Sequence, residues 1–118
     1  MPELITDPVR IPVPGGKIID EHVGAASTGD RGVSVARMEA PAGWTEPYQT
    51  PDFDEVTVVL GGEVVVDHDG GPTSVLAGQS IVTRAGERIR YRVGPEGATY
   101  LAICTPAFTP EGVHRDKD

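Results

Sequence analysis

The segment Gly43–Gly62 reads GWTEPYQTPDFDEVTVVLGG, and the expected architecture follows from it. Its first part is polar and rich in proline, and it leads directly into an apolar run that ends at Gly61-Gly62. We expect the run from Glu55 to Leu60 to be a strand, because β-branched residues dominate it and glycines close it. Glu55 then lies at the mouth end of a strand, where its carboxylate either faces solvent or points into a pocket.

Short apolar runs separated by turn residues fill the rest of the chain. Gly61-Gly62 is expected to be a hairpin turn, and Gly94–Gly97 a further turn. About nine or ten short strands with almost no helix are typical of an all-β sandwich or barrel. The expected strands are Val9–Val13, Lys17–Val23, Val33–Met38, Glu55–Leu60, Glu63–Asp67, Thr73–Leu76, Ser80–Thr83, Ile89–Val93 and Ala98–Cys104.

Length and composition limit the possible functions. The chain has 118 residues, which fits one domain, and its 15 glycines and 11 prolines favour turns over helices. The formal net charge of −8 at pH 7 makes nucleic acid or an anionic membrane surface an unfavourable partner. The single cysteine, Cys104, cannot form an internal disulfide, and no signal or transmembrane segment is recognisable, so we expect a cytoplasmic protein.

The segment quoted above resembles the first motif of the cupins, which are small jelly-roll β-barrels. Gly43, Glu55 and Gly62 match the two glycines and the glutamate of that motif. Gln49 and Pro51 stand at its two usual histidine positions. The resemblance implies that the Glu55 side chain points into the barrel.

A second segment resembles the second cupin motif. Gly78 and Gly86 match its glycines, whereas Arg84, Ile89 and Val93 replace the usual proline, histidine and asparagine. Together the two motifs imply an all-β, single-domain cupin jelly-roll barrel. We expect an N-terminal arm with edge strands over residues 1–32, the barrel core over 33–106, and a polar tail over 107–118 that lies free on the surface, the alternative being a tail folded over the barrel mouth.

The departures from the motifs concern the metal site that many cupins carry. Cupin metals are generally held by three histidines and the glutamate, and only Glu55 of that set is present here. Gln49 is a weak neutral ligand, and Pro51 and Ile89 cannot bind a metal. We therefore expect neither the usual metal nor another cofactor.

Two narrower resemblances add detail. Phe53–Val56 and Val59–Glu63 are similar to small cupins of the ethanolamine-utilisation type, which also lack the histidine cluster. The segments Cys104–Phe108 and Val113–Asp116 are similar, over a short length, to the tail of ectoine synthase, a cupin that cyclises an amino acid by loss of water.

The expected pocket combines one carboxyl group with mostly apolar neighbours. In the cupin register Glu55 and Tyr91 are the candidate catalytic residues, and the candidate ligand-binding residues are Gln49, Thr57 and Ile89. No basic residue is expected on that face, so burial should raise the pKa of Glu55 and fit it for acid–base chemistry. Arg84, Arg88, Arg90 and Arg92 are expected to pair with acidic neighbours outside the barrel, the alternative being an anion clamp.

These residues leave three functions open. The first is a metal-independent lyase, cyclase or isomerase that uses Glu55, and the second is a module that binds a small molecule without turning it over. The third is a dimeric structural protein with a vestigial pocket, which would be favoured if Val59, Ile81 and Ile89 filled the interior. Because two central strands are apolar on both faces, we expect a homodimer, with the N-terminal arm as the alternative cover.

Overall fold

The computed structural model describes residues 1–117 and consists almost entirely of antiparallel β-structure. One short 3-10 turn, η1 (Pro110–Gly112), lies near the C-terminus. The seven strands are β1 (Val9–Ile11), β2 (Ile18–Val23), β3 (Ser34–Ala40), β4 (Asp54–His68), β5 (Gly71–Leu76), β6 (Ser80–Thr83) and β7 (Arg90–Thr105).

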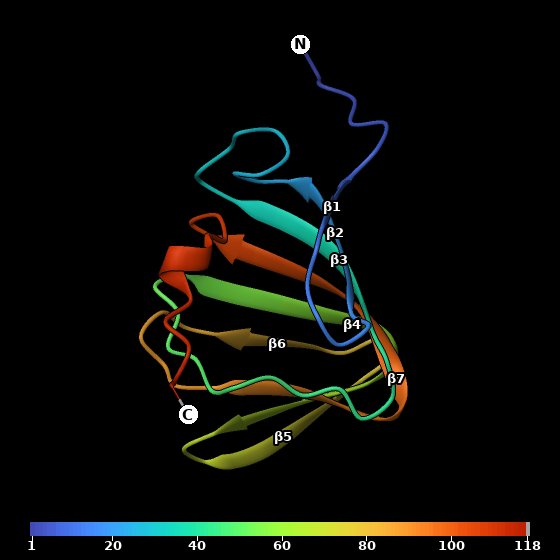
Figure 1. The fold of residues 1–118 in the computed structure, drawn as a ribbon, viewed down its shortest axis with the longest axis vertical. Coiled ribbons are helices and arrows are strands. Elements are labelled where there is room, and N and C mark those ends of the chain that lie inside the picture. Colours follow the sequence, from blue (N-terminus) through green and yellow to red (C-terminus); the bar gives the residue numbers. More distant parts are fainter. Residues whose placement is uncertain (118) are drawn as a thin grey trace.

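The strands form one sheet in the order β1-β2-β3-β7-β4-β5, and β6 pairs with β4. β4 and β7 are long and run side by side, from the pair Asp54 and Thr105 to the pair Asp67 and Arg90. Both strands bend at one end of the molecule, so each contributes to both layers of the barrel (Figure 1). This is a jelly-roll barrel, as the sequence predicts.

The long strands differ from the predicted short ones because two expected turns are absent. Gly61-Gly62 was predicted as a hairpin turn, but it lies within β4, where the register against β7 shifts. The predicted turn Gly94–Gly97 likewise lies within β7. The glycines allow irregular backbone at the bend, since Gly62 has φ +75° and packs directly against the Gly97 carbonyl.

The main core fills the side of the barrel where β4 and β7 bend. Val59, Val64, Val66 and Ile89 are almost completely buried there, and Tyr91 and Tyr100 from β7 complete the cluster. Trp44, Met38 and Ile81 pack against its edge. Inward side chains alternate with outward ones along β7, as predicted for Ile89, Tyr91 and Val93.

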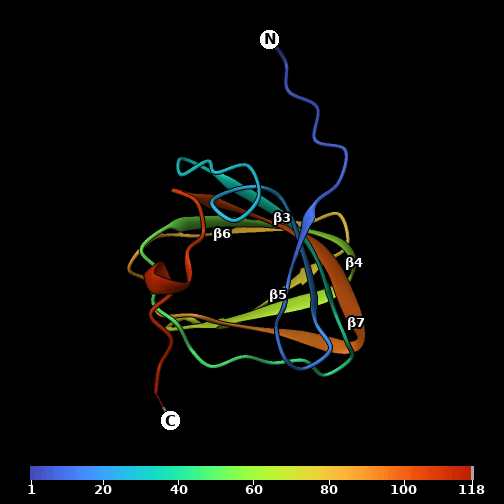
Figure 2. The same cartoon turned by 45° about the horizontal axis from the view of Figure 1, so that its top comes forward.

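The C-terminal segment is not the free surface tail that the sequence suggests. The Asp116 amide donates to the Tyr48 carbonyl, the Thr50 amide donates to the His114 carbonyl, and Gln49 forms a bridge with Arg115. Val113 is buried against Phe53 and Cys104. The segment therefore folds along the open end of the barrel, opposite the bend (Figure 2).

Within the described residues, no helix has the length and apolar character needed to cross a membrane.

Candidate functional site

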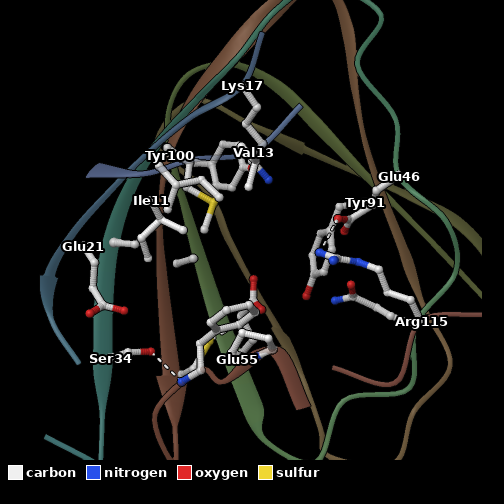
Figure 3. Close-up of a pocket in the computed structure, with 18 of the residues that line it drawn as sticks. Ile11, Val13, Lys17, Glu21, Ser34, Glu46, Glu55, Tyr91, Tyr100 and Arg115 are labelled. Atoms are coloured by element: carbon white, nitrogen blue, oxygen red, sulfur yellow. Dashed lines mark hydrogen bonds and ion pairs between the residues drawn. The ribbon is translucent and has the colours of Figure 1, made fainter. Parts of the chain in front are cut away.

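A cavity of about 220 Å³ lies inside the barrel. β2, β3, β4 and β7 supply most of its wall, the β1 region adds Ile11 and Val13, and the C-terminal segment adds Phe108 and Arg115 (Figure 3). The wall is mainly apolar and carries polar side chains on several sides. They are Lys17, Glu21, Ser34, Glu46, Gln49, Glu55, Tyr91 and Arg115.

Glu55 is the second residue of β4 and points into this cavity, as the sequence predicts (Figure 3). Its side chain accepts hydrogen bonds from Thr57 Oγ1 at 3.3 Å and from Cys104 Sγ at 3.6 Å. Burial and the nearby Glu46 carboxylate raise the pKa of Glu55 to about 7, although the Lys17 charge and the two donors act in the opposite direction. Glu55 is therefore divided between its acid and base forms near neutral pH.

Glu46 is a second carboxyl group in the cavity, and the sequence did not identify it as an acid–base residue. It follows the Thr45 bridge to Arg92, and its Oε2 lies 3.8 Å from Arg115 Nη2. Burial raises the pKa of Glu46, while the Lys17 and Arg115 charges and the Tyr91 amide lower it. Glu46 lies in the polar, proline-rich segment before β4, where carboxylates are usually solvated, so its position in the sequence gave little indication of a buried site.

Lys17 contradicts the expectation that no basic residue faces Glu55. It precedes β2 and lines the cavity, with its Nζ 3.9 Å from the centre of the Trp44 ring and 5.6 Å from that of Tyr100. Burial lowers the pKa of Lys17, while the Glu46 and Glu55 carboxylates raise it. The sequence predicted Lys17 as the first residue of a strand but gave its side chain no role in the site, since it follows Gly15-Gly16 outside both motifs.

Tyr91 and Gln49 line the cavity near Glu55, as expected. The Tyr91 hydroxyl shares a hydrogen bond of 2.9 Å with Thr83 Oγ1. Burial and the Glu55 carboxylate raise the pKa of Tyr91 well above its ordinary value. Tyr91 therefore stays protonated at neutral pH and can orient a ligand by hydrogen bonding, but it does not act readily as a base.

Thr57 and Ile89 were predicted to contact a ligand, but neither lines the cavity. Thr57 is fully buried, and its hydroxyl donates a hydrogen bond to the Glu55 carboxylate. Ile89 is buried in the main core. Both side chains share the inward face of their strands with Glu55 and Tyr91, but they are packed among other inward side chains and do not reach the cavity.

The donor atoms around the cavity do not fit the transition-metal site that cupin-like motifs suggest. Among residues 1–117, no three His, Cys, Asp or Glu side chains are grouped as a metal would require. His68 is the last residue of β4 and contacts Thr73, and His114 contacts Asp52 on the surface at 2.7 Å. No step in the proposed chemistry is therefore assigned to a metal.

The chain is similar to part of a curated protein, although no protein-family model matches it. It is 46% identical over 107 residues to endoribonuclease YbeY of Myxococcus xanthus strain DK1622. The match covers 90% of this chain but 36% of that protein, so the chain spans about a third of its length.

Solved structures with the same architecture identify the fold. Pac13 of Streptomyces, described as a nucleoside dehydratase, superposes with a TM-score of 0.76 at 14% identity, over 99% of this chain and 91% of its own. The ethanolamine utilization protein EutQ of Salmonella typhimurium LT2 gives a TM-score of 0.66 at 23% identity, over 78% and 71% of the two chains. The fold is that of the cupins, as predicted. The likeness of the tail to ectoine synthase stays a prediction.

Proposed function

We propose that this chain binds a small molecule in the barrel cavity and transforms it by metal-independent acid–base catalysis, as a lyase, cyclase or isomerase. The observation that carries the proposal is the buried Glu55 carboxyl, which lies in the cavity wall and has a pKa of about 7. A general acid or base works best when its pKa is near the operating pH. Strongly shifted carboxyl groups also concentrate at functional sites.

Two carboxyl groups with different environments give the site both an acid and a base. In the proposed reaction, protonated Glu55 donates a proton to a leaving oxygen or a carbonyl oxygen of the ligand. Glu46, in its ionised form, accepts a proton from carbon; burial raises its pKa, and the Lys17 and Arg115 charges favour the ionised form. Tyr91 and Gln49 orient the ligand by hydrogen bonds. Glu46 thus takes the proton-transfer role that the sequence-based hypothesis gave to Tyr91.

The main alternative is a module that binds the same ligand without turnover. The vestigial-pocket alternative is less favourable, because Val59 and Ile89 fill the core at the bend and still leave a cavity of about 220 Å³. A second proton-transfer group in the same cavity favours the enzyme over the binding module, and Glu46 is such a group. The Pac13 structure also supports an enzyme, since that cupin-fold protein is described as a dehydratase.

The endoribonuclease activity named for the Myxococcus protein is not proposed for this chain. RNA binding requires free cationic groups along a surface. Arg84, Arg88, Arg90 and Arg92 are paired with carboxylates, as expected: Arg84 with Asp54, Arg88 with Asp116, and Arg90 and Arg92 with Asp67. With a net charge of −8, these pairs leave little attraction for phosphates.

The proposal is tested by hydrogen exchange into a ligand panel, which detects proton abstraction even where net turnover is slow. Chelator-treated protein is incubated in D₂O with small hydroxy acids, keto acids and nucleosides, and deuterium at carbon is followed by NMR. We expect exchange into at least one compound, with a loss of 100-fold or more in Glu55→Gln.

The matched control is Glu39→Gln, which removes an exposed carboxylate paired with Arg37 outside the cavity. Exchange at the wild-type rate is expected for this variant. Exchange that persists in Glu55→Gln, or that disappears when metal is removed from the wild-type protein, would contradict the proposal.

A further inference from the structure

The cavity contains an ammonium group without a hydrogen-bonding partner. In the part of the chain that the structure describes, Lys17 Nζ makes no hydrogen bond and no ion pair, and it lies over the rings of Trp44 and Tyr100. Burying a charged group is costly unless it is paired and hydrogen-bonded. The site therefore offers a strong donor with three unused N–H bonds to a ligand.

A second cation faces the same space from a different element. Arg115, on the C-terminal segment, points into the cavity from the right in Figure 3, whereas Lys17 enters from the top. Its Nη2 lies 3.8 Å from Glu46 Oε2, too far for a hydrogen bond. Arg115 thus also keeps donors available for a ligand.

The carboxyl groups of the wall leave donors of the two cations free. Glu46 Oε2 comes no closer than 3.8 Å to Arg115 Nη2. Glu21, a further acidic group in the wall, accepts its hydrogen bonds from the Ala26 and Ser27 amides rather than from either cation. A carboxylate on the ligand can therefore take up the free donors of Lys17 and Arg115.

We infer that the natural ligand is a small monocarboxylate whose carboxylate group binds between Lys17 and Arg115 and whose apolar part lies against the aliphatic wall. This inference rests on the proposed function, which assigns the barrel cavity as the ligand site, and it adds the chemical class of the substrate. Side chains suited to the apolar part line the adjoining wall, namely Ile11, Val13, Ile19, Met38 and Phe108. A phosphate monoester fits less well, because its second negative charge would lie beside Glu46.

The single tryptophan makes the inference directly measurable. Trp44 is the only tryptophan of the chain, and Lys17 Nζ lies 3.9 Å from its ring, so a ligand that draws Lys17 away changes Trp44 fluorescence. Butyrate is titrated as the monocarboxylate, butyramide as its neutral analogue, and methyl phosphate as the phosphate monoester. We expect a saturable change with butyrate, none with butyramide, and weaker binding of methyl phosphate.

Variants that each remove one charged side chain measure how much that charge contributes to butyrate binding. Lys17→Met should weaken butyrate binding at least tenfold, and Arg115→Met several-fold, because each removes a charge-assisted hydrogen bond. Glu46→Gln should strengthen binding, since it removes the competing negative charge. Arg37→Met, which removes an exposed arginine outside the cavity, should leave the affinity unchanged.

Equal binding of butyrate and butyramide, tighter binding of methyl phosphate, or weaker binding in Glu46→Gln would overturn the inference. These comparisons do not depend on whether Lys17→Met folds. Carboxylate binding without deuterium exchange would contradict the enzyme proposal and leave this inference intact. Deuterium exchange into a neutral compound, with no binding of butyrate, would support the enzyme proposal and contradict the inference that the ligand is a monocarboxylate.

Discussion

At the scale of single residues, the site follows from where Glu55 is buried. Its carboxylate receives two weak hydrogen bonds and no direct cation, so desolvation dominates and the neutral acid is favoured. Asp67 has the opposite environment, because Arg92 and Arg90 bond to it directly and lower its pKa. The same chemical group is therefore a candidate catalyst inside the barrel and a structural anion outside it.

Glu55 should make the protein less stable as the pH rises. Its pKa is raised in the folded state, so the folded protein binds more protons than the unfolded chain between pH 4.5 and about 7. The free energy of unfolding should therefore fall, by roughly 2 to 3 kcal/mol between pH 5 and pH 8 from this group. Glu55→Gln should lose that part of the dependence and be more stable than the wild type at pH 8.

Urea denaturation at several pH values measures the effect, with Glu39→Gln as the exposed control. Other groups contribute to the absolute slope, including Glu46, whose pKa is also raised, so the difference between wild type and variant is the informative quantity. If the free energy of unfolding changed with pH in the same way for Glu55→Gln and the wild type, Glu55 would have an ordinary pKa.

Metal removal should have no effect on the folded protein. The cavity is lined by Gln49, Cys104 and three carboxyl groups rather than by imidazoles, and no three of the described His, Cys, Asp or Glu side chains are grouped as a transition metal would require. Protein purified without a His-tag should contain less than stoichiometric metal by elemental analysis, and chelator should leave its melting temperature unchanged. A stoichiometric metal that resists the chelator would show that other groups hold it.

The sequence predicted part of this site and missed the rest for a physical reason. Glu55, Gln49 and Tyr91 could be placed because motif spacing and strand alternation fix their faces. Lys17, Glu46 and Arg115 come from a turn, a loop and the C-terminal segment, where no periodicity orients a side chain. Their positions depend on long-range packing across the open end of the barrel.

At the scale of elements, the bend of β4 and β7 determines how the barrel closes. The sequence predicted separate strands because Gly61-Gly62 and Gly94–Gly97 resemble turns. Glycine serves here instead to let two continuous strands change register and approach closely. Local composition does not distinguish a turn from a bulged bend, since both need the same backbone freedom.

Gly62→Ala tests this role of glycine. A Cβ at position 62 would lie 2.1 Å from the Gly97 carbonyl oxygen, and the φ of +75° is unfavourable for alanine. We expect a loss of roughly 3 kcal/mol or more in the free energy of unfolding, from backbone strain and overpacking together.

Gly43→Ala is the matched control for that variant. Gly43 has a similar φ of +73°, but a Cβ there meets nothing within 4 Å. It should lose only about 1 kcal/mol, from backbone strain alone. Equal losses in the two variants, measured by urea denaturation, would show that close packing at the bend contributes nothing.

At the scale of the whole molecule, the outer face of the sheet is apolar along one row. The row crosses β3, β7, β4 and β6 through the paired residues Val35, Ile103, Val56 and Val82. Val82 is 47% exposed, and the N-terminal arm, the alternative cover, lines the cavity instead with Ile11 and Val13. The homodimer predicted from the sequence is therefore proposed to form across this row.

Val82→Glu tests the homodimer. Sedimentation at micromolar concentration should give a dimer mass for the wild type and a monomer mass for the variant, because a charge would be buried in the interface. Val9→Glu is the matched control, since Val9 is 42% exposed on the edge strand β1 and should leave the dimer intact. A wild-type protein that sediments as a monomer would contradict the proposal.

The most direct test of the account is the pKa of Glu55, measured by NMR titration of carboxyl carbons in protein labelled at glutamate. Comparison with Glu55→Gln assigns the resonance, and the account predicts a midpoint of about 7. A midpoint near the ordinary glutamate value of 4.5 would place Glu55 in a solvated environment and contradict its assignment as the acid–base group of the cavity.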